Sequence, residues 1–264
     1  MPKQIINGTY LFYQDQGQGL PLVLLHGYPL DGRLWQHQLA DLSTLFRVIV
    51  PDLRGFGQST GGGDFTIESQ ADDVHALAGA LNLGKFVLAG LSMGGYITLA
   101  YCRKYPSTLR GVGLIDTRAE GDTPQGRQNR DKAIELVQAQ GSKAIADQML
   151  PKLLAPETLN HRPQLAAVVR QMCENCPPRT IATALAAMRD RMDQTDYLPS
   201  LADPTLIIVG DQDVITPPVI SDAMHKAIPQ SQLVVVRGAG HLSPLEQPQQ
   251  VNRALRTFLQ GLSE

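Results

Sequence analysis

The chain has 264 residues, a formal net charge of −2 at pH 7 and a hydrophobic fraction of 43%. This length suits one large α/β domain, which can bury a substantial core. The weak net charge, the 5% of aromatic residues and the single tryptophan predict no nucleic acid partner and no attraction to an anionic membrane. No apolar run approaches the ~20 residues of a membrane-spanning helix, and residues 1–8 lack the apolar stretch of a signal peptide.

The three cysteines, Cys102, Cys173 and Cys176, are an odd and sparse set. They predict no disulfide framework and favour a reducing, cytoplasmic location. Cys173 and Cys176 form a C-x-x-C pattern, but it lies in an alanine-rich region of helical periodicity and is followed by two prolines. A thioredoxin-like site would need a βαβ pattern beside it, and a zinc site would need a second pair of ligands. We therefore expect neither a metal nor a redox site.

In chain order, residues 3–14 alternate in polarity and reach a turn at 17–19, which predicts an antiparallel hairpin at the start of a sheet. Short continuous apolar runs, typical of strands buried on both faces, then occur at 22–25, 47–50, 86–89, 111–116, 205–209 and 233–236. Helices are expected over 34–42, 66–81 (with Thr66 or Ser69 as N-cap), 96–105, 217–228 and 248–259. This alternation implies an α/β fold, in which a mostly parallel eight-stranded sheet carries helices on both faces.

The region from residue 117 to 200 differs from the rest, because it is rich in Ala, Gln and Arg and contains no buried β run. Its periodicity predicts helices over 130–140, 143–153, 163–173 and 179–192. We therefore expect a core formed by residues 1–116 and 201–264, and a helical cap formed by residues 117–200. Ligands of open α/β sheets bind at the carboxyl edge, so the cap should lie across that edge as a lid. A helical domain away from the site is the alternative.

The five residues Gly90-Leu91-Ser92-Met93-Gly94 follow one of the predicted strands and open a predicted helix. This is a G-x-S-x-G pattern in strand–turn–helix context, which holds a serine on a sharp, strained turn with its hydroxyl above the sheet edge. Small neighbours are required because the backbone passes close to itself on both sides of the serine. Ser92 is therefore the candidate nucleophile.

A serine hydroxyl needs an imidazole to remove its proton, and the imidazole needs a carboxylate to fix its tautomer. His241 follows the last predicted strand and lies after both partners in the chain, so it is the candidate base. Asp213 is the preferred acid. Asp211 directly follows a strand's terminal glycine, where it can brace the turn, and Asp116, at the end of an earlier strand, is a third option.

An oxyanion formed at this site needs two backbone N–H donors. Met93, the residue after the candidate nucleophile, is expected to supply one. The loop His26-Gly27-Tyr28-Pro29 is expected to supply the other, because Gly27 lets the backbone approach and Tyr28 offers its amide. His26 itself is expected to hydrogen-bond within its loop rather than act in catalysis.

Several motifs occur in one order along nearly the whole chain. They are His26-Gly27, Asp52-Leu53-Arg54-Gly55-Phe56-Gly57-Gln58-Ser59, the turn at Ser92, Gly210–Asp213, and Gly240-His241 followed by Glu246 and Pro248. Together they resemble the α/β-hydrolase superfamily. The resemblance implies Ser92, Asp213 and His241 as a catalytic triad, with the amides of Tyr28 and Met93 as the oxyanion hole.

Within the superfamily, the stretch from His26 to Asp31, with Trp35, looks like the branch that holds small carboxylesterases, cofactor-free haloperoxidases (perhydrolases) and 3-oxoadipate enol-lactonases. The H-G-x-G-P-G loop common in C–C bond hydrolases is absent. A serine at position 92, where haloalkane dehalogenases and epoxide hydrolases carry aspartate, counts against those two classes.

The resemblance implies a serine hydrolase of the carboxylesterase type, which cleaves a small-molecule ester through an acyl-enzyme and needs no cofactor or metal. Trp35 and Leu242 are expected to line the substrate pocket, and for Trp35 core packing is an equal alternative. Lactone hydrolysis and perhydrolysis are the alternatives within catalysis. A small-molecule receptor on the same fold is the alternative outside it, since fold alone does not fix function.

Overall fold

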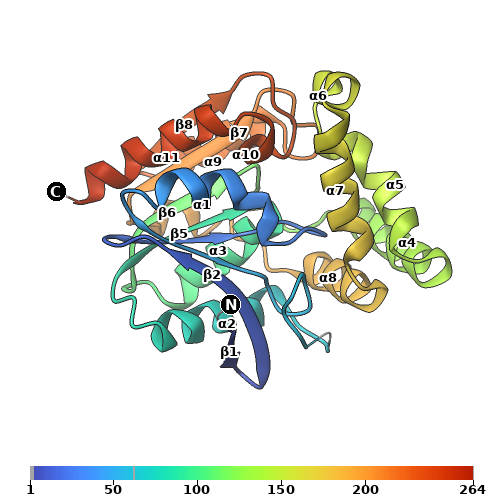
Figure 1. The fold of residues 1–264 in the computed structure, drawn as a ribbon, viewed down its shortest axis with the longest axis horizontal. Coiled ribbons are helices and arrows are strands. Elements are labelled where there is room, and N and C mark those ends of the chain that lie inside the picture. Colours follow the sequence, from blue (N-terminus) through green and yellow to red (C-terminus); the bar gives the residue numbers. More distant parts are fainter. Residues whose placement is uncertain (1–2, 62, 264) are drawn as a thin grey trace.

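The computed structural model describes residues 3–61 and 63–263, whose strands form one sheet (Figure 1). The strands are β1 (Lys3–Ile6), β2 (Thr9–Gln16), β3 (Pro21–Leu25), β4 (Arg47–Pro51), β5 (Phe86–Leu91), β6 (Leu109–Ile115), β7 (Thr205–Gly210) and β8 (Ser231–Val236). Their spatial order is β1-β2-β4-β3-β5-β6-β7-β8. β1 is antiparallel to β2, and β2 to β4, whereas the other neighbouring pairs are parallel. The predicted mostly parallel, eight-stranded sheet is confirmed.

Helices cover both faces of this sheet. They are η1 (Gly32–Trp35), α1 (Gln36–Leu42), α2 (Ile67–Ala80), α3 (Met93–Lys104), α9 (Pro218–Ala227), α10 (Ser243–Glu246) and α11 (Pro248–Ser263). α1 and α11 pack together on one face, and α2 and α3 on the other (Figure 1). In β3, Leu22 and Leu24 belong to the cluster beneath α1 and α11, whereas Val23 and Leu25 belong to the cluster beneath α2 and α3. This alternation is why a strand buried on both faces is a continuous apolar run.

The first hairpin turns earlier than the sequence suggested. Asn7 and Gly8 connect β1 to β2, with φ values of 45° and 78°. Asn-Gly is a favoured pair for a two-residue hairpin turn, because both positions need a positive φ. Residues 17–19, where the turn was expected, instead lead from β2 into β3.

α2 begins at its predicted N-cap. The Thr66 hydroxyl accepts a hydrogen bond from the N–H of Ser69 (3.1 Å), and the Ser69 hydroxyl accepts one from the N–H of Thr66 (2.9 Å). This reciprocal capping box satisfies N–H groups that a helix start otherwise leaves unpaired. Ser69, weighed as a second candidate N-cap, is therefore the partner of the first.

Further helices lie between β6 and β7 in the chain and form a separate group at one side of the sheet (Figure 1). These are α4 (Pro124–Gln140), α5 (Ser142–Leu153), α6 (Pro156–His161), α7 (Pro163–Asn175) and α8 (Pro178–Asp190). We call residues 117–200 the helical insertion. A proline opens α4, α6, α7 and α8, where its missing N–H costs nothing. The sequence did not predict α6, because its six residues are too few for a periodic signal.

The helical insertion contacts loops that follow the parallel strands. Thr180 Oγ1 donates to the carbonyl of Gly55 (3.0 Å), in the loop after β4. The N–H of Ala155 donates to Glu246 Oε2 (2.8 Å), which lies after β8. Both loops leave the carboxyl ends of their strands, so the insertion sits at that edge of the sheet.

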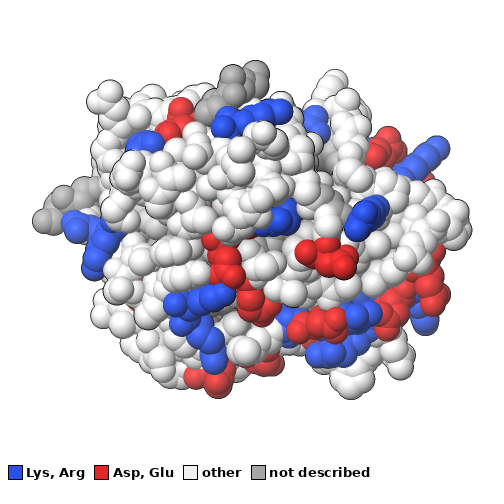
Figure 2. Space-filling model, turned by 90° about the horizontal axis from the view of Figure 1, so that it is seen from below, with Lys and Arg blue, Asp and Glu red and all other residues white. Residues whose placement is uncertain are grey.

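The surface carries mixed charge. On the face shown in Figure 2, basic and acidic side chains lie beside one another rather than gathering into a patch of one sign. Ion pairs on the surface, such as Arg189–Asp131 (2.6 Å) and Arg103–Asp196 (2.5 Å), also place a basic side chain beside an acidic one. Among the residues that the structure describes, no helix combines the length and the apolar character needed to cross a bilayer.

Candidate active site

Ser92 lies on a strained turn between β5 and α3. Its φ is 53° and its ψ is −113°, and a positive φ is unfavourable for a residue with a Cβ. Two glycines make the turn possible. A Cβ on Gly90 would lie 2.1 Å from the carbonyl oxygen of Gly94, and a Cβ on Gly94 would lie 2.4 Å from that of Leu25. The backbone therefore has the close approach that the G-x-S-x-G pattern predicted.

We expect Gly90→Ala to lower the free energy of unfolding by about 3 kcal/mol, because the added methyl group meets backbone atoms that cannot move aside. Denaturant unfolding measures this change. Gly79→Ala is the matched control: it is an exposed position in α2 with nothing within 4 Å of the added Cβ. It should be neutral or stabilising by up to about 1 kcal/mol. Equal effects of the two substitutions would contradict the tight packing at the turn.

Asp213 and His241 form a buried hydrogen-bonded pair after β7 and β8. His241 Nδ1 lies 2.8 Å from Asp213 Oδ2. The hydroxyl of Thr216 also donates to Oδ2 (2.6 Å), while the N–H groups of Ile215 and Thr216 donate to Oδ1 (2.8 and 2.9 Å). With Nδ1–H donated to the carboxylate, a neutral His241 presents Nε2 as a proton acceptor. Sequence reasoning missed Thr216, although an aspartate followed three residues later by threonine is a typical turn signal.

The two members of this pair shift each other's pKa. Burial by itself raises the pKa of Asp213, but the His241 charge and the hydrogen bonds from His241 and Thr216 hold that pKa at about 2. Burial lowers the pKa of His241, whereas the charge and hydrogen bond of Asp213, and then the charge of Asp116, raise it above its ordinary value. Asp213 therefore stays ionised at neutral pH, and a protonated His241 is stabilised beside it.

Asp116, at the end of β6, braces the same edge. It is fully buried and has a φ of 43°. Its Oδ1 accepts from the N–H of Gly210 (2.8 Å), and its Oδ2 accepts from the hydroxyl (2.6 Å) and the N–H (3.3 Å) of Ser243. It thus ties the end of β7 to the segment after His241, and its carboxylate makes no hydrogen bond to the imidazole. Burial, followed by the charge of Asp213, raises the pKa of Asp116 to about 8.

This raised pKa gives a pH-dependent stability. The unfolded chain releases the Asp116 proton near pH ~4, whereas the folded chain keeps it to higher pH. The stabilising contribution of this group is therefore complete below pH ~4 and is lost as the pH rises through the folded pKa. Asp116→Asn cannot ionise. We expect its melting temperature, relative to that of the native chain, to rise between pH 5 and pH 8. A difference that stays constant over this range would contradict the prediction.

Asp211 and His26 have bonding partners away from the His241 imidazole. Asp211 Oδ1 accepts from the N–H of Gly238 (2.8 Å), which braces the loop that leads to His241. His26 Nε2 accepts from the N–H of Leu53 (3.0 Å), while Nδ1 lies 3.0 Å from the carbonyl of Gly27 and can donate to it. These contacts fix His26 as a neutral imidazole with its proton on Nδ1, and burial lowers its pKa. The contacts of Asp211 and of His26 therefore hold their loops in place.

Two N–H groups at the turn are available as donors. Met93 is the first residue of α3, where an N–H has no intrahelical acceptor. The N–H of Tyr28 donates to no other described residue. A Cβ on Gly27 would lie only 3.2 Å from Ser92 Cβ, so the Tyr28 loop passes directly beside the candidate nucleophile. The structure therefore brings Tyr28, Met93 and Ser92 together.

Ser92 and His241 share this edge without a hydrogen bond between their side chains in the part of the chain described. The N–H of Ser92 donates to the carbonyl of Ile115 (3.0 Å), the residue before Asp116, and Asp116 in turn bonds Ser243, two residues after His241. From β3 the chain passes to β4 on one side and later to β5 on the other side. The strand order therefore reverses between β3 and β5, and ligands of such sheets bind at this switch point. Catalytic hydrogen bonds in such sites often tighten only when substrate binds.

Trp35 and Leu242 are both fully buried, with 0% exposure, in one apolar cluster that also includes residues of α5 and α7. Trp35 Nε1 has no hydrogen-bond partner among the described residues. Neither side chain lines the two cavities described below. For Trp35 this position is that of core packing, and a pocket role for either residue stays a prediction.

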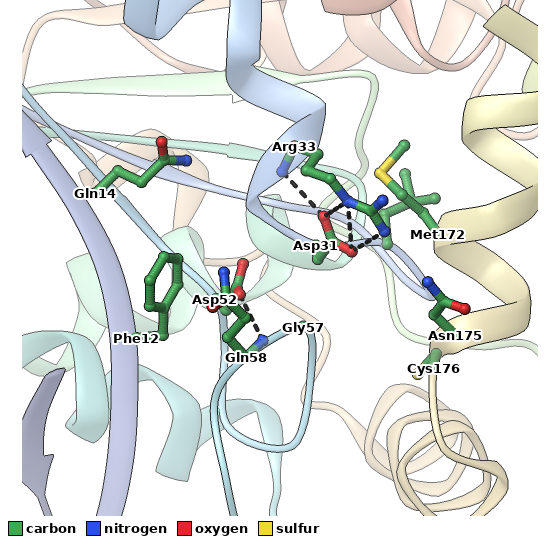
Figure 3. Close-up of a pocket in the computed structure, with 11 residues that line it drawn as sticks. Phe12, Gln14, Asp31, Arg33, Asp52, Gly57, Gln58, Met172, Asn175 and Cys176 are labelled. Carbon is green, nitrogen blue, oxygen red and sulfur yellow. Dashed lines mark hydrogen bonds and ion pairs between the residues drawn. The ribbon is translucent and has the colours of Figure 1, made fainter. Parts of the chain in front are cut away.

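A cavity of about 440 Å³ lies between the loop after β4 and the end of α7 (Figure 3). Its charged groups already have partners. Arg33 makes a bidentate pair with Asp31, through Nε to Oδ1 (2.9 Å) and Nη2 to Oδ2 (2.7 Å). Asp52 accepts from the N–H groups of Gly32 and Gln58, each at 2.7 Å. The charged groups of this cavity are thus engaged in holding the loops, and His241 is not among the residues that line it.

A second cavity, of about 710 Å³, lies between the helical insertion and the loops that carry Tyr28 and Asp213. On the core side it is lined by Tyr28, and by Val214 and Ile215, which directly follow Asp213. On the insertion side it is lined by residues of α4, α5 and α8, among them Arg130. Sequence reasoning could not name these insertion residues. We call this space the Tyr28 cavity.

Glu246 joins the helical insertion to the loop of His241. It is buried, and its Oε1 accepts from the N–H of Gly240 (2.8 Å) while its Oε2 accepts from the N–H of Ala155 (2.8 Å). Its carbonyl also accepts from Arg162 Nη1 (2.6 Å). One carboxylate therefore fixes the residue before His241 relative to the start of α6.

Known proteins resemble the chain along most of its length. The sequence profile of the α/β-hydrolase fold family matches residues 21–248. The AB hydrolase superfamily protein YisY of Bacillus subtilis is 33% identical over 261 residues, which cover 94% of each chain. A putative non-heme chloroperoxidase of Synechocystis is 31% identical over 273 residues, which cover 95% of each.

Solved structures agree with this assignment. A thermophilic esterase from Thermogutta terrifontis, solved with malate bound, superposes with a TM-score of 0.96 and is 44% identical, over 100% of this chain and 99% of that one. The enol-lactonase from Burkholderia xenovorans gives a TM-score of 0.92 at 27% identity, over 98% and 100% of the two chains. The chain therefore belongs to the α/β-hydrolase fold family, among relatives that include esterases, enol-lactonases and non-heme haloperoxidases.

Proposed function

We propose that the protein is a carboxylesterase-type serine hydrolase that cleaves small carboxylic esters through an acyl-enzyme. The observation that supports this most directly is the buried His241–Asp213 hydrogen bond of 2.8 Å, at the sheet edge where the strained turn presents Ser92. The three residues occur in the chain order that this architecture requires. The esterase relatives support the same reaction type.

Each residue has a defined step in this mechanism. Ser92 Oγ attacks the ester carbonyl carbon while His241 Nε2 accepts its proton. The N–H groups of Tyr28 and Met93 stabilise the negative charge on the former carbonyl oxygen. When the tetrahedral intermediate collapses, His241 returns the proton to the departing alcohol. Water then repeats the sequence on the acyl-enzyme, with His241 as base, and releases the carboxylic acid and Ser92. Asp213 holds the tautomer and stabilises the imidazolium throughout.

We also propose that the helical insertion, residues 117–200, is the cap of this site, on a core formed by residues 1–116 and 201–264. Its contacts with the loops after β4 and β8 support this division. The substrate is a small molecule that reaches Ser92 under this cap. All three cysteines are free and buried, which fits the cytoplasmic location that the sequence predicts.

Two measurements on the native chain test the proposal. Initial rates on p-nitrophenyl esters with two to twelve acyl carbons should be highest for short chains. A fluorophosphonate should stop this turnover and add one covalent group, which mass spectrometry of the digested protein locates at Ser92. Turnover that persists after stoichiometric labelling, or labelling at a different serine, would exclude Ser92 as the nucleophile. A chain that binds small ligands and turns over none of the esters would favour the receptor alternative.

Lactone hydrolysis is a second candidate, because an enol-lactonase superposes on 98% of this chain with a TM-score of 0.92. The same acyl-enzyme chemistry opens a lactone, and the alcohol then stays attached to the acyl group. Rates on γ-butyrolactone and on ethyl butyrate, measured side by side by pH-stat, separate the two. A lactone rate above the ester rate would assign the protein to lactonases. Adding hydrogen peroxide to the ester assay tests perhydrolysis in the same way.

A further inference from the structure

The Tyr28 cavity is lined by more positive than negative charge. Arg130, Lys132 and Lys152 line it, and Asp122 is its lining carboxylate. Arg130 belongs to a row on α4 that also includes Gly126, Asn129 and Ala133. Residues three and four apart share one helix face, so this face of α4 is turned to the cavity.

The Asp122 charge is already compensated. Its Oδ1 accepts from Arg191 Nη1 (2.6 Å), and the Arg191 side chain is only 3% exposed. Its Oδ2 accepts from Arg130 Nε (3.0 Å). Burial raises the pKa of Asp122, but the charges of Arg130 and Arg191 lower it below its ordinary value. Two guanidinium groups therefore share one carboxylate, which leaves the charged lining of the cavity net positive.

The guanidinium of Arg130 has hydrogen-bond donors that its pair with Asp122 does not use. Its side chain is 24% exposed, and neither Nη atom hydrogen-bonds to another described residue. The guanidinium interacts electrostatically with Tyr28 and Tyr96 as well as with Asp122, so it lies among groups of the core as well as of the insertion. A guanidinium that lines a cavity and keeps both Nη atoms without a partner in the described part of the chain can bind a carboxylate in a bidentate manner.

The hydroxyl of Tyr28 also lacks a partner. Tyr28 is 6% exposed, and its Oη atom is buried with no hydrogen bond among the described residues. Leaving a buried hydroxyl unpaired is unfavourable, and because Tyr28 lines the cavity, a ligand atom there can supply the missing hydrogen bond. The backbone N–H of Tyr28 is also a candidate oxyanion-hole donor beside Ser92. A single residue therefore offers its hydroxyl to the cavity and its amide to the reaction site. The Tyr28 cavity is therefore lined by a residue whose loop passes directly beside Ser92.

We propose that the Tyr28 cavity binds a carboxylate and that the natural substrates are monoanionic esters, in which Arg130 and the Tyr28 hydroxyl hold a free carboxylate while the ester carbonyl lies at Ser92. Half-esters of short dicarboxylic acids have this chemistry. This inference rests on the proposed function and adds the substrate class to it. The reaction remains hydrolysis: water and the half-ester give an alcohol and a dicarboxylate.

The test compares two esters of the same acyl chain length that differ in the group at the end of that chain. Monoethyl glutarate carries a carboxylate at the end of a five-carbon acyl chain, and ethyl pentanoate carries a methyl group there. Hydrolysis is followed by pH-stat on the native chain, and half-esters of malonate, succinate and adipate find the best length. We expect kcat/KM for the best half-ester to exceed that for its neutral counterpart roughly tenfold to hundredfold, the usual worth of a charge-assisted hydrogen bond. A native ratio near one would overturn the inference.

Variants assign the preference to residues. Arg130→Gln should lower the anionic-to-neutral ratio of kcat/KM at least about tenfold, and mainly through KM. Arg127→Gln is the matched control, because Arg127 lies one turn earlier on α4, pairs with Asp190 and does not line the cavity. Its ratio should equal the native one. An equal fall in both variants would indicate a diffuse field rather than a site and would contradict the proposal.

Tyr28→Phe separates binding from folding. It keeps the backbone N–H and removes only a hydroxyl that bonds to none of the described residues, so the melting temperature should not fall. The anionic-to-neutral ratio should fall about fivefold, as expected for one lost hydrogen bond. An unchanged ratio would exclude the hydroxyl. If Ser92-dependent hydrolysis occurs without preference for the anion, only this inference fails. If no ester is hydrolysed, the proposed function fails and this inference with it.

Discussion

Replacing Ser92 with alanine is expected to lower kcat on p-nitrophenyl butyrate by at least about 10⁴-fold, because the members of a catalytic triad act as a unit. The methyl group cannot attack the carbonyl, and His241 then has no hydroxyl to deprotonate. Residual turnover should resemble that of water activated in the same cavity, which oxyanion stabilisation and binding still accelerate. Stopped assays at high enzyme concentration measure this residual turnover.

Two controls test whether a loss of activity in Ser92→Ala comes from the missing hydroxyl rather than from unfolding. Ser107→Ala removes a hydroxyl from an exposed serine away from the strained turn and should keep native rates. Circular dichroism and the melting temperature should show that Ser92→Ala remains folded and about as stable as the native chain, because alanine keeps the Cβ and therefore the same backbone strain at this turn. Native-like turnover in Ser92→Ala would exclude the entire acyl-enzyme mechanism.

Asp213→Asn should lower kcat by about 10³- to 10⁴-fold. The amide can donate to His241 Nδ1 and so favours the tautomer whose Nε2 carries the proton, in which the imidazole cannot accept the proton of Ser92. The variant also loses a charge that raises the pKa of His241. Turnover needs neutral His241, so the rate rises with pH through that pKa, and this acid limb should move to lower pH in the variant.

The matched control is Asp211→Asn, two residues earlier in the same loop. Its carboxylate bonds the N–H of Gly238 and has no contact with the imidazole, so we expect a small loss of stability and kcat within about tenfold of the native value. Profiles of kcat/KM from pH 4 to pH 9 measure both effects. If Asp211→Asn lost the activity and Asp213→Asn kept it, the acid would be assigned to the wrong carboxylate.

The fold was predictable because local sequence and tertiary position agree in it. β3, β5 and β7 are buried on both faces, so each must be a short apolar run, and the helices between them carry ordinary caps such as Thr66. The strained turn at Ser92 was predictable for a similar reason, since few sequences other than one with glycines at positions 90 and 94 can form this turn. These signals lie within a few residues of one another.

The features that escaped prediction depend on segments far apart in the chain. The position of Trp35 is set by residues from several strands and helices, and a tryptophan suits a core and a pocket wall equally. Arg130 looks like any exposed helical arginine until α4 is packed against the loop of Tyr28. The contact of Glu246 with Ala155 spans 91 residues, which no local pattern records.

The carboxylate of Glu246 limits how this hydrolase can be re-engineered by exchange of parts. An insertion transplanted from a relative must bring a backbone N–H to the position of Ala155, because a buried carboxylate left with one partner fewer costs about 3 kcal/mol. The graft would otherwise disturb Gly240, on the loop that carries His241, although no catalytic residue had been changed. Chimaeras of this fold should therefore exchange the insertion and the segment from 238 to 248 together.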